Sequence, residues 1–219
     1  SNKKDLASRL RNVVQALRQD DDLEASSYDE SSAGLSSLCQ ALATRVAHKD
    51  KQVRLYSVSA CMELFAIFAP DAPWNTNDTL EIFQQTIRQL ANLAHATSPT
   101  QSNFSEYFRI LELLAKIKIG VLLVELSKRE GNAGASYRKH DKDDGSGNDD
   151  DDNDEKQYSK QALQVLCELF RTLLQSVRLE HPPEIAELAQ LTIAGCLEEF
   201  YESLLLPIPL LDEILICIG

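Results

Sequence analysis

The sequence lacks an uninterrupted apolar run of the roughly 18 to 20 residues that a membrane-spanning helix needs, and the segment Ser1 to Asp5 is polar. We therefore expect neither a membrane anchor nor a signal peptide, and an intracellular protein. The five cysteines are an odd number spread along the chain, which argues against a disulfide framework. Because they lie mostly among apolar residues, they are predicted to be buried free thiols.

Sequence motifs for catalysis and metal binding are also missing. The four histidines are scattered, and neither Cys-x-x-Cys nor His-Glu-x-x-His occurs. Half of the eight glycines lie in one acidic segment, so no glycine-rich turn remains elsewhere to hold a phosphate. We therefore predict that the protein is not an enzyme and that it binds neither a metal ion nor a cofactor.

Negative charge dominates, with a formal net charge of -12, but it is unevenly distributed. Between Glu130 and Tyr158 there are ten acidic and four basic side chains among glycine and serine. This segment has nothing apolar to bury, so it is predicted to be a disordered insertion. Its role as a solvated loop or as a lure for basic partners such as histone tails stays open. No dense cluster of lysine and arginine occurs elsewhere, so direct sequence-specific binding of nucleic acid is not expected.

Outside the acidic segment, apolar residues recur at steps of three and four, which is the period of helices packed on one face. All seven prolines fall between the helices that this period marks, and no alternating pattern indicates a strand. The predicted fold class is therefore all-α, with no sheet.

Several helix boundaries can be predicted from local signals. Asp50 is expected to cap a strongly amphipathic helix that ends before Pro70. Asn77 is expected to cap the next helix. Gly120 is a plausible kink or break in the long apolar series that begins at Phe104.

The predicted helices pair into repeats. The helix pairs are expected at 35–68, 78–127 and 159–204. The distances between their first residues fit a repeat of roughly 40 to 47 residues once the length of the insertion is subtracted. The sequence Asp-Lys-Gln-Val-Arg at 50–54 resembles the HEAT-repeat signature, in which the acid caps the second helix and the arginine braces the loop. We predict a HEAT-repeat α-solenoid of antiparallel helix pairs, although a globular helical bundle would give the same periodicity. Its parts are 1–129, with an N-terminal helix and the first repeats, the insertion 130–158, and 159–219 with further repeat helices.

The order of these features resembles the N-terminal region of the precocious dissociation of sisters family (Pds, protein five), HEAT-repeat proteins associated with cohesin. The similarity covers most of the chain outside the acidic segment. Its most specific block is DKQVRLYSVSACMELFAIFAPDAPW, at 50–74, and further matches are LASRLRNVVQAL at 6–17, IFQQTIRQLANL at 82–93, YFRILELLAKIK at 107–118, LFRTL at 169–173 and LLDEILI at 210–216.

The resemblance implies a non-catalytic, nuclear, chromatin-associated regulator of sister-chromatid cohesion that binds the cohesin ring through its kleisin subunit. Family members use the proline-containing pentapeptide to dock short motifs of the release factor Wapl and, in animals, of the antagonist sororin. Carried to this chain, the candidate site is the pentapeptide with its two aromatic neighbours: Phe68, Ala69, Pro70, Asp71, Ala72, Pro73 and Trp74. The two prolines would limit the backbone entropy lost on binding, and Asp71 could accept hydrogen bonds from a peptide.

Other interpretations remain open at this point. Pro70 and Pro73 can merely end a helix, with Trp74 packed under the next one. A general helical-repeat adaptor of nuclear transport or vesicle coats, or a histone-binding role of the acidic segment, would also fit the sequence. Because the apolar run from Leu204 to Ile218 would leave a hydrophobic stripe uncovered, we expect a fragment or truncated product that self-associates through its C-terminal helices.

Overall fold

The computed structural model describes residues 3–19, 33–69, 72–118, 120–123, 160–203 and 206–218. No strand occurs within these ranges, and the all-α prediction is confirmed. The predicted acidic insertion at 130–158 lies outside the described residues. The elements are α1 (Lys3–Gln19), α2 (Ala33–Ala43), α3 (Lys51–Phe68), α4 (Thr76–Leu90), the 3-10 helix η2 (Ala91–His95), α5 (Phe104–Ile117), α7 (Lys160–Ser176), α8 (Pro183–Ser203) and α9 (Ile208–Ile218).

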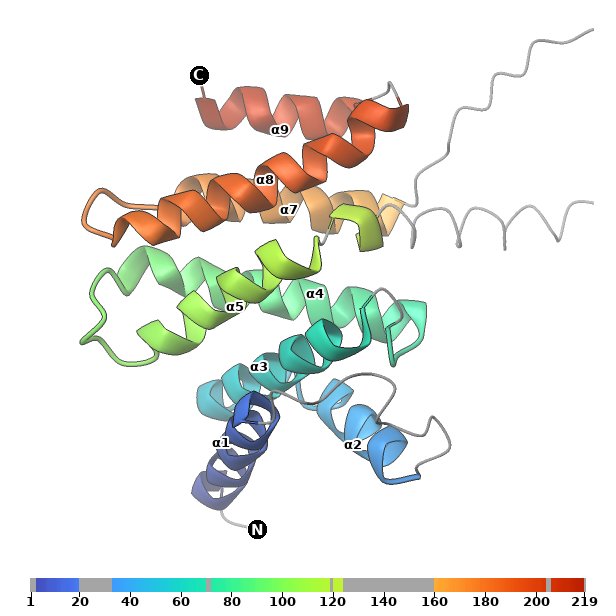
Figure 1. Ribbon diagram of the computed structural model, residues 1–219, viewed down its shortest axis with the longest axis vertical. Coiled ribbons are helices and arrows are strands. Elements are labelled where there is room, and N and C mark those ends of the chain that lie inside the picture. Colours follow the sequence, from blue (N-terminus) through green and yellow to red (C-terminus); the bar gives the residue numbers. More distant parts are fainter. Residues whose placement is uncertain are drawn as a thin grey trace, which may run out of the picture.

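The helices stack in chain order from α1 at one end to α9 at the other, as Figure 1 shows. In one layer α3 packs on α5 and α5 packs on α8, while in the other α4 packs on α7 and α7 packs on α9. The helix pairs α2–α3, α4–α5 and α7–α8 occupy the regions predicted for the repeats. The α-solenoid prediction is therefore confirmed, and α1 packs on α3 at the first end of the stack.

The turn into α3 has the geometry that the HEAT-like signature predicts. The Asp50 side chain accepts hydrogen bonds from the backbone N–H groups of Gln52 at 2.9 Å and Val53 at 3.2 Å, which caps the helix. The Arg54 guanidinium donates to the carbonyl oxygen of His48 at 3.0 Å. The acid therefore fixes the first turn of α3, and the arginine braces the loop that precedes it.

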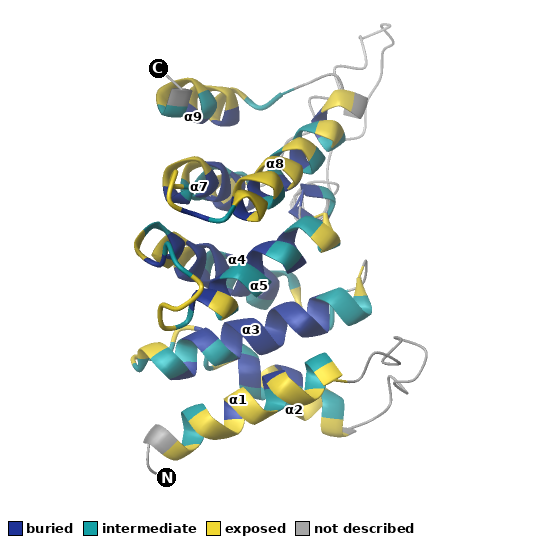
Figure 2. Cartoon of the chain, turned by 60° about the vertical axis from the view of Figure 1, so that its left-hand side comes forward, coloured by how far each residue is buried: buried dark blue, intermediate teal, exposed yellow. Residues whose placement is uncertain are grey.

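Helix α3 packs against four other helices, and the prediction that it is strongly amphipathic is wrong. Every residue from Ser57 to Phe65 is buried, as the dark blue of α3 in Figure 2 illustrates. The reason is that α1, α2, α4 and α5 all pack on this one helix, so little of its circumference faces solvent. Polar residues that looked like a solvent-facing stripe are therefore inside the protein.

Helix α4 begins two residues earlier than predicted. Its N-cap is Asn75, whose side chain accepts from the backbone N–H of Asp78 at 2.9 Å, so the prediction of Asn77 is wrong. The anchored ring of the preceding Trp74, described below, fixes where the chain enters the helix. The helix continues directly into the 3-10 helix η2, which forms its C-terminal end.

The prediction of a break near Gly120 is right about the region but wrong about the residue. Helix α5 ends at Ile117 because Lys118 adopts the left-handed conformation, with φ of 52°. Gly120 lies against α8 instead: a Cβ atom placed there would be 2.6 Å from the Cα atom of Cys196. The absence of a side chain at Gly120 therefore allows two segments of backbone to approach closely.

The later repeats are joined to the earlier ones by polar contacts. In the turn before α8, the ring of His181 is buried, and its Nδ1 accepts from the backbone N–H of Arg178 at 2.9 Å. Its Nε2 then donates to the carbonyl oxygen of Leu93 at 3.0 Å, which ties this turn to η2. The prediction of buried free thiols is confirmed for Cys39, Cys61 and Cys196, whereas Cys167 and Cys217 are only partly buried.

Candidate functional site

The candidate site lies in the connection between α3 and α4, here called the docking segment (residues 68–74). Ala69 is exposed, while Phe68, Ala72 and Pro73 are partly buried. The backbone N–H of Ala69 donates to the carbonyl oxygen of Phe65 at 2.9 Å, so the segment leaves the helix from a fixed point. The predicted site residues Pro70 and Asp71 lie outside the described residues.

Trp74 anchors the far end of the docking segment to the preceding helix pair. Its indole N–H donates to the backbone carbonyl of Cys39 in α2 at 2.9 Å. Its ring lies 4.7 Å from the ring of Phe65, centre to centre, and Phe65 in turn stacks on Phe83 at 4.9 Å. The indole group is therefore part of the packing between helices. It contacts α2 and α3 directly and α4 through Phe65.

These contacts fix the two described ends of the docking segment, Ala69 and Trp74. Both ends are held by contacts to α2 and α3, and none of its described residues is fully buried. An interior position would have excluded a partner. Of the described members of the predicted site, Ala69 is exposed, whereas Phe68, Ala72 and Trp74 are partly buried and pack against the hydrophobic core.

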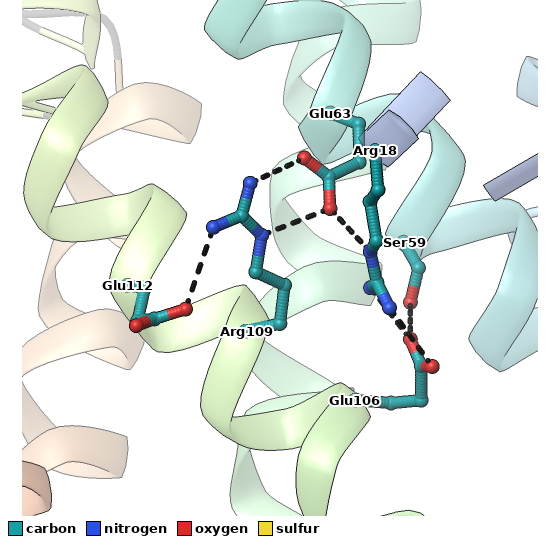
Figure 3. Close-up of polar contacts among 6 residues, drawn as sticks. All are labelled: Arg18, Ser59, Glu63, Glu106, Arg109 and Glu112. Carbon is teal, nitrogen blue, oxygen red and sulfur yellow. Dashed lines mark hydrogen bonds and ion pairs between the residues drawn. The ribbon is translucent and has the colours of Figure 1, made fainter. Parts of the chain in front are cut away.

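A second polar constellation lies where α1, α3 and α5 meet, and Figure 3 shows its arrangement. Glu63 of α3, with a side chain only 5% exposed, accepts from Arg18 Nε at 2.7 Å and from Arg109 Nε and Nη2 at 3.0 and 2.9 Å. Arg18 also donates to both carboxylate oxygens of Glu106, and Arg109 donates to Glu112. We call these five residues the arginine–glutamate network.

The electrostatics of this network hold both arginines in the charged form. The hydrogen bonds that Arg109 donates to Glu63 raise the pKa of Arg109 above its ordinary value, against the effect of burial. For Arg18, burial is the largest single effect and lowers the pKa, but hydrogen bonds to Glu106 and Glu63 outweigh it and the net shift is upward. Since charge-assisted pairs are stronger than neutral ones, the network fastens α1 and α5 to α3.

The thiols of Cys61 and Cys196 are shielded from solvent. Burial raises the pKa of Cys196 to about 12, and it also raises the pKa of Cys61, so neither thiol is activated as a nucleophile. No group of three or more histidine, cysteine or acidic residues in the described ranges could hold a metal ion. Among the same residues, no helix is both long and apolar enough to span a bilayer. What this part of the chain offers is surfaces and buried cross-links between helices.

Sequence reasoning missed the arginine–glutamate network. The contacts that link its helices join residues 45 to 88 apart in the chain, so no local spacing indicates them. One signal was available: Glu63 is a single acid within an apolar run of α3, and a buried carboxylate requires a paired cation. The sequence does not indicate which arginines supply that charge.

Comparison with known proteins identifies the family. The family model described as "Sister chromatid cohesion protein PDS5 protein" matches residues 4–131. Sister chromatid cohesion protein pds5 of Schizosaccharomyces pombe is 35% identical over 83 residues, which cover 38% of this chain and 7% of that protein. The PDS5 homolog B-B of Xenopus laevis is 34% identical over 127 residues, covering 57% of this chain and 8% of the relative.

A human relative and a solved structure agree with these matches. Human PDS5 homolog B is 39% identical over 80 residues, which cover 36% of this chain and 5% of the relative. The chain thus matches less than a tenth of the length of these curated relatives. A chain in the solved structure of the Pds5-Scc1 complex superposes with a TM-score of 0.64 at 18% identity, covering 98% of this chain and 25% of that one, which supports the solenoid fold. Because the family model covers more than half of the sequence, this chain belongs to the PDS5 family of sister chromatid cohesion proteins.

Proposed function

We propose that this chain is part of a non-catalytic cohesin-associated scaffold that regulates sister chromatid cohesion on chromatin in the nucleus. The observation that carries the proposal is the family match over residues 4–131, which contains the docking segment and the network that holds α1, α3 and α5 together. A rigid stack of helices has the properties that a scaffold needs, because it presents surfaces without a change of shape.

The cohesin kleisin is the first partner that we propose. The protein in the solved complex is bound to Scc1, and its fold covers 98% of this chain. We extend that kind of partner to the present protein as a proposal. Binding of purified Scc1-type kleisin to the chain, measured by calorimetry, tests it.

A release or protection factor is the second proposed partner, and the docking segment is its proposed site. Wapl-type and sororin-like motifs would lie over the exposed Ala69 and the partly buried Pro73, with Asp71 accepting an arginine or a backbone N–H group. Trp74 supports this site from below, because its N–H already binds the α2 carbonyl. A segment held at both ends loses little entropy when a peptide binds.

A double substitution tests the site directly. Asp71→Ala with Pro73→Ala should abolish the binding of Wapl-type peptides while leaving the helical circular dichroism spectrum unchanged. The matched control is Asp212→Ala with Pro209→Ala, an exposed aspartate and an exposed proline at the opposite end of the stack. Equal affinity of the double variant and the control in calorimetry would refute the assignment.

A further inference from the structure

The connection between η2 and α5 contains a short segment, here called the hydroxyl turn (residues 97–102), that combines hydroxyl side chains with a proline. Its sequence is Thr-Ser-Pro-Thr-Gln-Ser, so four of its six residues carry a hydroxyl group. Ser98 directly precedes Pro99, and none of the other prolines in the sequence follows a serine or a threonine. The sequence therefore has a single Ser/Thr-Pro dipeptide, and it lies in this turn.

The hydroxyl turn lies at the surface of the stack. Pro99, Thr100, Gln101 and Ser102 are exposed, and Ser98 is partly buried. Figure 1 shows the connection between α4 and α5 looping outward at the left edge of the stack. Another protein can therefore approach this turn without displacing a helix.

The hydrogen bonds of Ser98 stay within the turn. Its carbonyl oxygen accepts from the backbone N–H of Gln101 at 2.9 Å, and its own N–H donates to the side-chain oxygen of Gln101 at 2.9 Å. Its hydroxyl oxygen lies 3.0 Å from the hydroxyl oxygen of Thr100 and accepts from the Thr100 N–H at 3.4 Å. The result is a closed β-turn with Pro99 at its second position, which proline favours. Opening this turn breaks only local bonds, so Ser98 can become extended while the helices stay packed.

The two corresponding turns of the stack are fixed more firmly. In the turn before α3, Asp50 caps the helix and Arg54 braces the loop. In the turn before α8, the buried ring of His181 is bonded to η2. The hydroxyl turn has neither device: the side chain of Asn103, the N-cap residue of α5, makes no capping bond, and residues 98–100 bond to no helix in the described part of the chain. Of the three turns, it is therefore the one that opens most easily.

A proline after a serine is a chemical signal that a protein kinase can read. Proline has no backbone N–H group. A kinase that presents an apolar surface at this position accepts proline, whereas the N–H of any other residue would be left there without an acceptor. Ser98 and Pro99 together have the chemistry that such a proline-directed kinase requires.

We propose that Ser98 is a phosphorylation site for a proline-directed protein kinase. The Oγ atom of Ser98 attacks the γ-phosphorus of ATP held by the kinase, and the bond from that phosphorus to the bridging oxygen breaks. ADP leaves, and the hydroxyl proton passes to the catalytic aspartate of the kinase. The site is separate from the docking segment, so its test does not depend on the proposed peptide binding.

The added charge would fall beside a basic turn. A phosphate group carries about −1.5 to −2 charges at pH 7. The side-chain nitrogen of Gln52 lies 3.5 Å from the side-chain oxygen of Asn103, so the start of α3 adjoins the end of the hydroxyl turn. Residues 45–51, just before that point, contain three lysines and arginines and one acid. Phosphorylation would therefore place negative charge next to a basic surface, which favours the modified state.

Incubation of the whole chain with ATP and a purified cyclin-dependent kinase, a proline-directed enzyme, tests the proposal. Mass spectrometry should find one phosphate per chain, located at Ser98, and Ser98→Ala should remove it. Pro99→Ala keeps the hydroxyl group but restores the N–H, so incorporation should slow at least about tenfold. Ser102→Ala, an exposed serine of the same turn that no proline follows, is the matched control and should leave the rate unchanged.

A synthetic peptide of residues 93–104 shows whether the folded protein gives access to the site. Both the peptide and the folded chain should be phosphorylated, and the helical circular dichroism spectrum of the chain should be the same before and after the reaction. Phosphorylation of the peptide but not of the folded chain would overturn the proposal. So would a phosphate that persists in Ser98→Ala, or a rate that Pro99→Ala does not change.

Discussion

Removal of the Glu63 carboxylate gives the sharpest test of how the stack is held together. Glu63→Ala eliminates three charge-assisted hydrogen bonds, one from Arg18 and two from Arg109. The carboxylate is buried, with a side chain 5% exposed, so water does not replace it in the folded protein. Both arginines then lose their shared partner at the junction of α1, α3 and α5.

The size of the effect follows from what each arginine retains. Removing one member of a fully buried ion pair costs about 3–5 kcal/mol. Here the side chains of Arg18 and Arg109 are 26% and 37% exposed, and they keep Glu106 and Glu112 as partners. We therefore expect about 3 kcal/mol for Glu63→Ala, the low end of that range, and a fall in Tm of about 6 to 12 °C.

Glu112→Ala is the matched control. Its carboxylate is 38% exposed and makes a single contact of 3.4 Å to Arg109, so less than about 1 kcal/mol is expected. The free energy of unfolding of both variants is measured by urea titration with circular dichroism. If Glu63→Ala destabilises the protein no more than Glu112→Ala does, the network does not hold the three helices together and the reasoning fails.

Three further predictions concern individual contacts. Gly120→Ala should lower the free energy of unfolding by about 1–3 kcal/mol because the added Cβ atom would meet the backbone of Cys196. Gly195→Ala should stabilise α8 slightly, since no atom lies within 4 Å of the Cβ atom added there. Urea midpoints compare the two variants, and equal shifts would contradict the close approach at Gly120. Trp74→Phe keeps the ring contact but loses the indole N–H bond to α2, so about 1 kcal/mol should be lost in thermal melts, and an unchanged melt would contradict that bond. The hydrogen bond from Arg171 on α7 lowers the pKa of Glu213, so the stabilisation by this ion pair is complete above the ordinary pKa of 4.5 and is lost as the pH falls through the lowered pKa. The stability difference between wild type and Glu213→Gln should therefore shrink in acid. A constant difference from pH 7 down to acid would be inconsistent with the lowered pKa.

Features that depend on neighbouring residues were predictable from the sequence. The apolar period located the helix pairs, and Asp50 caps α3 as the local signature predicts. The bracing contact of Arg54 with the loop also follows from that signature, because donor and acceptor are only six residues apart. The position of the docking segment at a helix–helix connection follows from the prolines that interrupt the helical pattern.

Features that depend on the packing of distant helices were not predictable. Two asparagines, 75 and 77, have the chemistry of a helix cap, and the long-range anchoring of Trp74 to α2 decides between them. The pattern of α3 suggested one polar face, yet its position among four helices buries Glu63 and Ser59. Gly120 resembled a local helix breaker, but its role depends on α8, which lies far along the chain.

The most direct measurement of the central claim, that a rigidly supported connection between α3 and α4 receives a partner's peptide, uses the fluorescence of the single tryptophan. Trp74 is the only tryptophan in the sequence, and it lies at the base of the docking segment. Titration with a Wapl-type peptide should change its emission saturably in the wild type and in Asp212→Ala with Pro209→Ala, and should leave Asp71→Ala with Pro73→Ala without response. An equal response in all three proteins, or none in the wild type, would contradict the claim.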